Sequence, residues 1–265
     1  MKLKNIASRL RLEIIKMSNR AKAPHLASSL SCIDIVITLY EKVLKIFPKN
    51  PGKSSRDKFI LSKGHAATAL YVTLAHKGFF PKKKLLDYTK KNSLLEEHPN
   101  PSIKGVETAT GSLGHGLPVG CGLALSGKIQ NLNFKTIVLL GDGECNEGTV
   151  WEAAMFASSK KLENLYVIVD QNGWQGIGRT KDILNVKLLK KKWASFGWNS
   201  IEIDGHNYKQ IENIFKKKRN GKPTAVIAKT IKGKGISFME DDNNWHYRIP
   251  TTNEVTKAKK ELNIK

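Results

Sequence analysis

The sequence predicts an α/β fold with a mostly parallel sheet, and two observations support this prediction. An apolar run at Ile137–Leu140 is followed by a helical pattern and then by a second apolar run at Leu165–Val169. This order of strand, helix and strand is typical of a βαβ unit, whose two strands run parallel. The chain has 265 residues, of which 40% are hydrophobic. It is long enough for a large buried core, and we predict a single domain over residues 1–265.

The N-terminal part is predicted to be largely helical. Residues 1–20 form an amphipathic pattern with one apolar face, made of Leu3, Ile6, Leu10, Ile14 and Met17. We interpret this helix as packing on the core, with binding to a membrane surface as the alternative. Residues 22–31 are predicted to be a loop. The capping-box spacing of Ser31 and Asp34 then predicts the start of a buried helix that continues to Val43.

The middle of the chain combines short elements with a glycine-rich segment. Residues 56–69 predict a short strand, a polar turn and the start of a helix, which ends near Gly78. Residues 82–104 are polar and are predicted to be partly helical. Residues 108–122 contain five glycines, which permit tight turns and a close approach of the backbone to a ligand.

Beyond the βαβ unit the pattern alternates again between helices and strands. The predicted elements are a turn at 176–180, a helix at Leu184–Phe196, a strand at Ser200–Ile203, a helix at Tyr208–Lys218 and a strand at Pro223–Lys229. The last fifteen residues are polar, and we expect them to be helical or frayed.

The net charge of +22 is carried mostly by lysine. Basic chains of this kind include proteins that bind nucleic acid or membrane surfaces. Here the lysines are scattered in short groups, and no basic motif is interleaved with aromatic residues. We therefore predict a solvated basic surface and no nucleic-acid partner, with attraction of phosphorylated substrates or of an acidic partner chain as the alternative. The main groups are Lys82–Lys84, Lys190–Lys192 and Lys216–Lys218.

The cysteines and the N-terminus bear on the compartment. Cys32, Cys121 and Cys145 are odd in number and lack the spacing of metal ligands, which favours a reducing compartment. The first twenty residues carry charges throughout and have no apolar core of signal-peptide length. No apolar run approaches the length of a membrane span. We predict a cytoplasmic protein with no membrane role.

Candidate ligands follow the two predicted parallel strands. Asp142 stands in Gly141-Asp142-Gly143 after the first apolar run, and Asn172 follows the second. Parallel strands end at the same edge of a sheet, so these two oxygen-bearing side chains are expected to meet although they lie thirty residues apart. Mg²⁺ prefers oxygen ligands and adds waters and substrate phosphates to them. Gly143 and the helix start after it suit a phosphate, and the sequence therefore predicts a metal–diphosphate site.

The same residues carry a resemblance to a known family. A Gly-Asp-Gly followed about thirty residues later by Asn is the thiamine diphosphate-binding motif, and the longer segment GDGECNEGTVWEAAMFA…NLYVIVDQNGWQ resembles transketolase. The resemblance implies the thiamine diphosphate-binding fold, with helices on both faces of the sheet. It implies thiamine diphosphate and Mg²⁺ as cofactors, with Ca²⁺ or Mn²⁺ as alternatives. The implied metal ligands are Asp142, Asn172 and the backbone carbonyl of Trp174.

The resemblance covers almost the whole chain and implies further site residues. The segment TATGSLGHG is similar to the family's cofactor loop, which implies that the backbone near Gly116 and Leu117 faces the aminopyrimidine ring. Other implied cofactor contacts are Gly114, His115, Gly141, Gly143, Glu144 and Glu147, of which Glu147 joins a carboxylate network across a subunit interface in this family. Asp204-Gly205-His206 resembles a segment whose role in the family is structural.

Four histidines match active-site positions of the family. His65, in RDKFILSKGHAATA, is expected to approach the cofactor diphosphate and the substrate. His25, His98 and His246 are expected to line the substrate channel and to orient hydroxyls or move protons, since the pKa of histidine lies near neutrality. The surroundings depart from the family pattern: glycines are missing around His25, Glu97 replaces a glycine, and Tyr247-Arg248 follows His246. Arg248 is a candidate contact for a substrate phosphate, with a plain surface arginine as the alternative.

One catalytic group has no counterpart in this sequence. Thiamine diphosphate chemistry needs a Glu against the aminopyrimidine ring, and in transketolases that Glu lies in a second, pyrimidine-binding domain. No Glu of this chain stands in the matching context. The resemblance therefore implies the N-terminal subunit of a split transketolase, which transfers a two-carbon ketol unit between sugar phosphates. The expected partner is a C-terminal transketolase subunit, in a heterotetramer with two copies of each chain.

Two other classes of function stay open at this point. One is a subunit of another thiamine diphosphate enzyme, such as a 2-oxo acid dehydrogenase E1 or a deoxyxylulose-phosphate synthase relative; the several histidines and TATGSLGHG favour ketol transfer over it. The other is a non-catalytic binding or regulatory protein, against which Asp142, Asn172 and the histidines argue. A specialised ketol transfer in surface-sugar synthesis is a variant of the main hypothesis.

Overall fold

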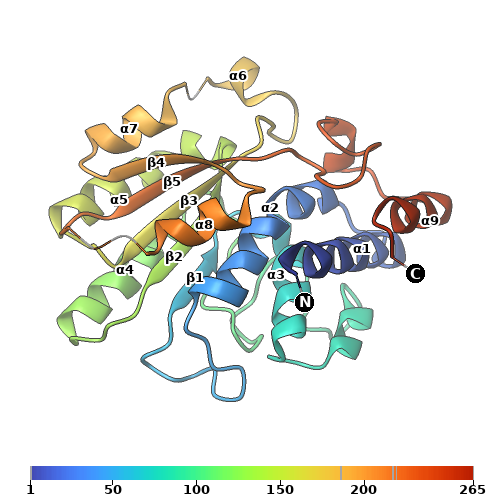
Figure 1. Ribbon diagram of the computed structural model, residues 1–265, viewed down its shortest axis with the longest axis horizontal. Helices are drawn as coiled ribbons and strands as arrows, with labels where there is room; N and C mark the ends of the chain where they lie inside the picture. The colour runs from blue at the N-terminus through green and yellow to red at the C-terminus, as the bar shows by residue number, and fades with distance from the viewer. Residues whose placement is uncertain (1, 186, 217, 219, 265) are drawn as a thin grey trace.

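A five-stranded parallel sheet organises the chain (Figure 1). The computed structural model describes residues 2–185, 187–216, 218 and 220–264. The strand order is β1-β2-β3-β5-β4, and each neighbouring pair is parallel. This confirms the α/β fold and the parallel βαβ unit. The strands are β1 (Lys58–Leu61), β2 (Thr136–Gly141), β3 (Leu165–Gln171), β4 (Asn199–Asp204) and β5 (Thr224–Lys229).

Helices cover both faces of this sheet, because successive strand residues point to opposite sides. On β2, Ile137 and Leu139 join one hydrophobic cluster, while Val138 and Leu140 join the other. The first cluster also contains residues of α1 (Leu3–Ala21), α2 (Leu26–Thr38), α3 (Ala67–Lys77) and α8 (Tyr208–Ile214). The second contains residues of α4 (Gly116–Ile129), α5 (Gly148–Ser159) and α7 (Leu189–Ser195).

The first helix packs on the core, as the sequence predicts. Its residues Ile6, Leu10, Ile14 and Met17 are buried, and α1 contacts α2 and α3. The C-terminal helix α9 (Thr252–Glu261) also contacts α1 and begins with a capping box formed by Thr251 and Glu254. The ends of the chain therefore lie on the same side of the molecule (Figure 1). None of the described helices combines the length and the apolar character that crossing a bilayer requires.

Three predicted helix boundaries were wrong. Helix α2 begins at Leu26, so Ser31 lies inside it and does not cap it; its hydroxyl donates to Ser28 and Asp170 instead. The helix predicted at Leu184–Phe196 is shorter: α7 begins at Leu189, after Leu188 in a left-handed conformation with φ 59°, and ends at Ser195. A separate short helix, α6 (Thr180–Ile183), lies before the predicted range. Helix α8 ends at Ile214. Met1, Val186, Lys217 and Lys265, which fall within predicted elements, lie outside the described residues.

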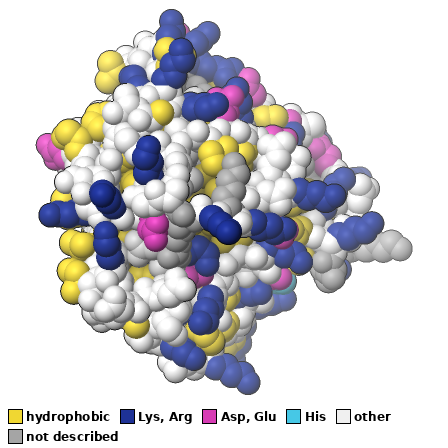
Figure 2. Space-filling view, turned by 60° about the vertical axis from the view of Figure 1, so that its left-hand side comes forward, with side chains coloured by type: hydrophobic (Ala, Val, Ile, Leu, Met, Phe, Trp, Pro, Cys, Tyr) yellow, Lys and Arg dark blue, Asp and Glu magenta, His cyan; other side chains and the backbone are white. Residues whose placement is uncertain are grey.

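Short turns of other helix types lie between the main elements. A π-helical turn at Leu39–Val43 extends α2. Short 3₁₀ turns lie at Gly64–Ala66, Lys82–Asp87, Gly143–Asn146 and Asn243–His246. The lysine and arginine side chains are distributed over the visible face in small groups (Figure 2).

Candidate functional site

The C-terminal edge of the sheet carries a cavity of about 340 Å³. Asp142 directly follows β2, and Asn172 directly follows β3, as the sequence predicts. The cavity brings together most of the predicted site residues: His25, His65, His98, Gly141, Asp142, Gly143, Glu144, Glu147, Asn172, Trp174 and His246. Gly114, His115, Gly116 and Leu117 lie in the adjoining loop and in the first turn of α4, outside the cavity lining.

Asp142 is buried in a network of donors that belong to its own and the neighbouring strand end. Its Oδ1 accepts from the Gly143 N–H at 2.9 Å, and its Oδ2 accepts from the Gly173 N–H at 2.8 Å and the Thr180 hydroxyl at 3.2 Å. Burial raises the pKa of Asp142 to about 6 despite these hydrogen bonds. A carboxylate offers about four acceptor positions, so one position on Oδ1 stays free for a cation.

Asn172 is oriented by its own loop. Its Oδ1 accepts from the Trp174 N–H at 3.0 Å, and its Nδ2 donates to the Ser31 hydroxyl at 3.5 Å. The amide oxygen is therefore turned toward the loop that also presents the Trp174 carbonyl. A carboxylate, an amide oxygen and a backbone carbonyl form a hard oxygen donor set of the kind that Mg²⁺ prefers.

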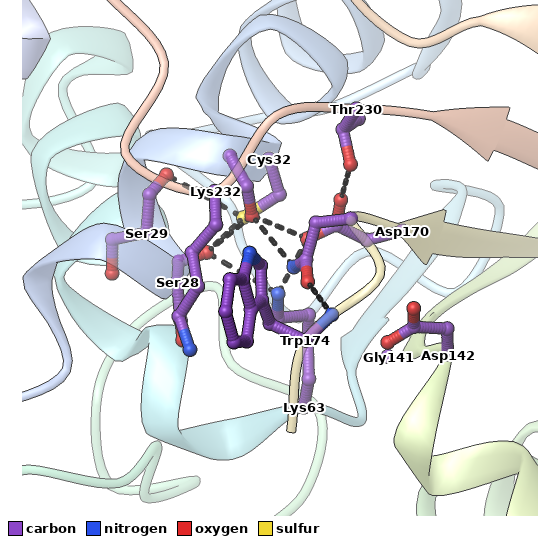
Figure 3. Close-up of polar contacts among 12 residues, drawn as sticks. Ser28, Ser29, Cys32, Lys63, Gly141, Asp142, Asp170, Trp174, Thr230 and Lys232 are labelled. Atoms are coloured by element: carbon purple, nitrogen blue, oxygen red, sulfur yellow. Dashed lines mark hydrogen bonds and ion pairs between the residues drawn. The ribbon is translucent and has the colours of Figure 1, made fainter. Parts of the chain in front are cut away.

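A buried ion pair between Lys63 and Asp170 fixes the strand ends beneath the cavity. The Lys63 Nζ lies 2.5 Å from Asp170 Oδ2 and 3.2 Å from the Ser28 carbonyl. Thr230, which follows β5, donates to Asp170 Oδ1 (Figure 3). Burial alone would lower the pKa of Lys63 and raise that of Asp170. The attraction between the two charges outweighs burial, so the pKa of Lys63 is raised and the pKa of Asp170 is lowered. The pair thus ties β1, β3, β5 and α2 together at one point.

Three histidines form a cluster on one side of the cavity. The ring centroids of His25, His65 and His246 lie 5.0–5.8 Å apart. The backbone N–H of His25 donates to the backbone carbonyl of His246 at 2.9 Å. Burial lowers the pKa of His25 to about 4 and that of His246 to about 3, and nearby Lys232 adds to both effects. Burial also lowers the pKa of His65. All three rings are therefore neutral at pH 7, so each can donate one hydrogen bond and accept another.

His98 reaches the cavity from the polar segment before the glycine-rich loop. A Cβ placed on Gly111 would meet its ring at 2.8 Å, and Gly111 has a φ of 144°, which side chains rarely adopt. Only glycine therefore lets this loop pass against His98. The Tyr247 ring packs on His25 and on His246, with centroids 5.6 and 4.6 Å away. Arg248 stacks on Trp245 and pairs with Glu254.

Glu144 holds the loops around the site. Its buried carboxylate accepts from the Ser62 hydroxyl, from the Gly114 N–H at 2.9 Å and from the Gly141 N–H at 3.1 Å. Burial raises its pKa. Because these donors come from three separate segments, Glu144 joins the end of β1, the glycine-rich loop and the end of β2. By contrast, His115 and Glu147 are exposed.

Lys232 is a site residue that the sequence analysis missed. It is 1% exposed, and its Nζ lies 2.7 Å from Asn243 Oδ1 and 2.9 Å from His246 Nδ1. Burial, and then repulsion from Lys63, lower the pKa of Lys232 to about 7. Its position three residues after the predicted strand Pro223–Lys229, at the edge of the sheet where the other strand-end residues lie, is the signal that could have identified it.

His206 has the structural role expected of it. Its Nδ1 lies 2.8 Å from Asp34 Oδ2, and its Nε2 accepts from the Ile231 N–H at 3.0 Å. Arg11 completes this group by donating twice to Asp34. The cluster anchors the segment that leads to Lys232 and lies outside the cavity lining.

The residues in the cavity, and Lys232 beside it, fit thiamine diphosphate and a divalent cation. The oxygen donors of Asp142, Asn172 and Trp174 suit the cation, and Lys232, Gly143 and His65 suit a diphosphate. The Gln175 Nε2 atom is buried without a hydrogen-bond partner among the described residues, as expected of a donor that awaits a ligand. Among the described residues, no three His, Cys, Asp or Glu side chains are grouped in a way that could hold a metal. The proposed donor set is compatible with this, because Asp142 is its one member of these residue types.

The chain matches the family described as "Transketolase, thiamine diphosphate binding domain" over residues 3–265. It is 38% identical over 254 residues to the A subunit of apulose-4-phosphate transketolase from Phocaeicola vulgatus, covering 95% of this chain and 90% of that protein. It is 41% identical over 263 residues to the protein of the same name from Actinobacillus succinogenes, covering 98% and 95%.

Longer transketolases match over part of their length. Human "Transketolase" is 39% identical over 245 residues, which cover 92% of this chain and 39% of that protein. The crystal structure of transketolase from Campylobacter jejuni superposes with a TM-score of 0.94 at 30% identity, covering 100% of this chain and 43% of that one. The chain therefore spans about two fifths of the length of these transketolases.

Proposed function

The chain belongs to the transketolase family, and we propose that it is the N-terminal subunit of a split transketolase that moves a two-carbon ketol unit from a ketose phosphate to an aldose phosphate. Asp142 and Asn172, at adjacent parallel strand ends and in one cavity with the histidine cluster, carry this proposal, and Lys232 contacts that cluster through His246. We also propose that residues 1–265 act as one diphosphate-binding domain.

Residues in and around the cavity have separate parts in binding. Asp142, Asn172 and the Trp174 carbonyl hold Mg²⁺, for which Ca²⁺ or Mn²⁺ can substitute. Gly143, His65 and Lys232 hold the diphosphate. Gly114, His115, Gly116 and Leu117 contact the rest of the cofactor from the glycine-rich loop, while Glu144 keeps that loop in register with the end of β2.

The bound cofactor supplies the carbanion chemistry of the two-carbon transfer. His25, His98 and His246 orient the hydroxyl groups of the sugar and hold or move protons at their ring nitrogens. The lowered pKa values of His25 and His246 suit this work, because a neutral ring can accept a proton from a hydroxyl and return it later. The buried walls around these rings also exclude water from the donor sugar.

A partner chain completes the site. Two relatives are named as single subunits of a transketolase, and the Glu required at the aminopyrimidine ring has no candidate here. We propose that a chain with a pyrimidine-binding domain supplies it, in a heterotetramer with two copies of each chain. Glu147 and His115 are exposed and are available to that chain. The buried, free cysteines Cys32, Cys121 and Cys145 support a reducing, cytoplasmic location.

The outer faces of α4 and α5 support such a partner. These helices contact each other, and each carries a single charged residue, Lys128 or Glu152. Their exposed side chains include Val119, Ile129, Met155 and Phe156, between 40% and 70% exposed. Exposed apolar side chains are normally covered when they cluster, so these sparsely charged faces on a chain of net charge +22 are suited to another protein.

Reconstitution tests the proposed function. The chain is assayed alone, and again with a chain that carries a transketolase pyrimidine-binding domain, using thiamine diphosphate, Mg²⁺, a ketose phosphate donor and an aldose phosphate acceptor. We expect ketol transfer only from the mixture. Robust turnover by this chain alone, or turnover of pyruvate in place of the ketose, would contradict the proposal.

A further inference from the structure

We infer that Gln175 is a binding residue for the diphosphate of the cofactor, through its side-chain amide. Neither the family motifs nor the predicted ligand set assigns this residue a role. The inference rests on the proposed function, because it concerns the same cavity. Gln175 lines that cavity and follows the metal-binding loop of Asn172 and Trp174.

The Gln175 amide is a buried donor without an acceptor. Its Nε2 atom has no hydrogen-bond partner among the described residues and almost no contact with solvent. Native proteins rarely leave such a donor unpaired, because it has lost its hydrogen bonds to water and gained none in return. A ligand oxygen that enters the cavity would satisfy it.

The amide lies against the glycine that the phosphate-binding motif supplies. A Cβ placed on Gly143 would lie 2.7 Å from the Gln175 Cγ, 2.9 Å from its Cδ and 3.4 Å from its Nε2. The missing side chain of Gly143 therefore provides the space that the Gln175 amide fills. A phosphate that approaches the Gly143 backbone comes within reach of this amide as well.

The backbone that carries Gln175 is held in place. The Gln175 N–H donates to the Gly178 carbonyl at 2.8 Å, and Trp174 forms an antiparallel bridge with Arg179. The Arg179 guanidinium stacks on Trp174 at 3.7 Å and donates twice to Asp241, at 2.7 Å each. The loop is thus bonded to the segment that follows Lys232, and these bonds favour the position of the donor in the cavity.

The surrounding charge indicates an anionic acceptor. The Lys232 Nζ lies 3.5 Å from the Gln175 carbonyl, so a buried cation stands in the same corner as the unpaired amide. The adjoining Asp142 and Asn172 are the cation ligands of the proposed site. An oxygen that faces a lysine, an amide donor and a bound cation together is a phosphate oxygen, and its place beside Gly143 favours the cofactor over a sugar phosphate.

Binding measurements on the complex with the partner chain test this role. Gln175→Met keeps the length of the side chain and removes the donor, and Gln175→Glu places an acceptor there. Gln130→Met is the matched control, since Gln130 is exposed at the end of α4 and its side chain donates to the Ser126 hydroxyl. Calorimetry with Mg²⁺ measures the affinity for thiamine diphosphate, inorganic diphosphate, thiamine and fructose 6-phosphate, and thermal unfolding checks the fold.

We expect Gln175→Met to weaken thiamine diphosphate and inorganic diphosphate equally, by about tenfold, as for the loss of one hydrogen bond to a charged group. Gln175→Glu should weaken both further, and thiamine should bind unchanged. Unchanged diphosphate affinity in both variants overturns the inference, as does a loss confined to fructose 6-phosphate. Failure of the wild-type complex to bind thiamine diphosphate at all overturns the proposed function itself, which separates the two failures.

Discussion

Lys232 should have two effects that depend on pH. It should make the folded chain less stable, and it should make the affinity for the cofactor change with pH. Burial lowers its pKa from 10.5 to about 7. Above pH 10.5 Lys232 is neutral in both the folded and the unfolded chain, so it does not reduce the stability. As the pH falls from 10.5 toward 7, the unfolded chain binds a proton that the folded chain does not, and the free energy of unfolding decreases. At about 1.4 kcal/mol per pH unit, a charged Lys232 costs the cofactor-free fold up to about 5 kcal/mol.

Replacement by methionine tests the size of this cost. Lys232→Met removes the buried charge but leaves Asn243 Oδ1 and His246 Nδ1 without their donor, at about 1–2 kcal/mol each. We therefore expect the cofactor-free variant to be about 2 kcal/mol more stable at pH 7, which raises the melting temperature by roughly 4–8 °C. Differential scanning calorimetry without cofactor measures this change.

The same lysine should take up a proton when the diphosphate binds. With a pKa of about 7, half of the Lys232 side chains are charged at pH 7 and about 3% at pH 8.5, so the affinity for Mg²⁺–thiamine diphosphate should fall about 16-fold over this interval. Calorimetry in buffers of different ionisation enthalpy counts the proton. Lys234→Met, in the same loop but paired with Glu240, should keep the wild-type dependence. An identical pH dependence in wild type and Lys232→Met, or a destabilised Lys232→Met, would refute this reasoning.

Three further predictions follow from the site. Asp170→Asn breaks the buried pair with Lys63 and should cost about 3–5 kcal/mol in urea unfolding, while Glu41→Gln, at a part-exposed pair, should cost less than about 1 kcal/mol; equal losses would contradict the role of the pair. Folding lowers the pKa of His25, so its stability contribution is complete above pH 6.5 and is lost as the pH falls toward 4. The free energy of unfolding of His25→Gln should therefore decrease less between pH 6.5 and 5 than that of the wild type. An equal decrease in both proteins would count against this prediction. Chelation of Mg²⁺ should lower the melting temperature of the cofactor-loaded wild type but leave Asp142→Asn unaffected, and an equal drop in both would remove Asp142 from the ligand set.

The strand ends were predictable because their signals are local. Each buried strand is a short apolar run that stops at turn residues, so the amino-acid pattern alone places Asp142 and Asn172 at one edge of the sheet. Helix limits were less accessible. Leu188 adopts a left-handed conformation that its residue type does not favour, and Ser31 donates to Asp170 from inside α2.

The buried lysines could not be identified from composition. Lys63 and Lys232 are both 1% exposed, but in a chain with 45 lysines and arginines they resemble surface residues. Their burial follows from tertiary packing, which brings Asp170 against Lys63 and Asn243 against Lys232. The unpaired Gln175 amide is likewise visible only once Gly143 and the loop after β3 are in place.

The sparsely charged outer faces of α4 and α5 should tie the amount of this chain in a cell to the supply of its partner. Copies made in excess would present Met155, Phe156 and Ile129 to water until they meet another chain. Such copies are prone to aggregate or to be degraded, whereas assembled copies are protected. Balanced synthesis of the two halves would then be a condition of a stable enzyme, and co-expression would be the practical route to soluble protein.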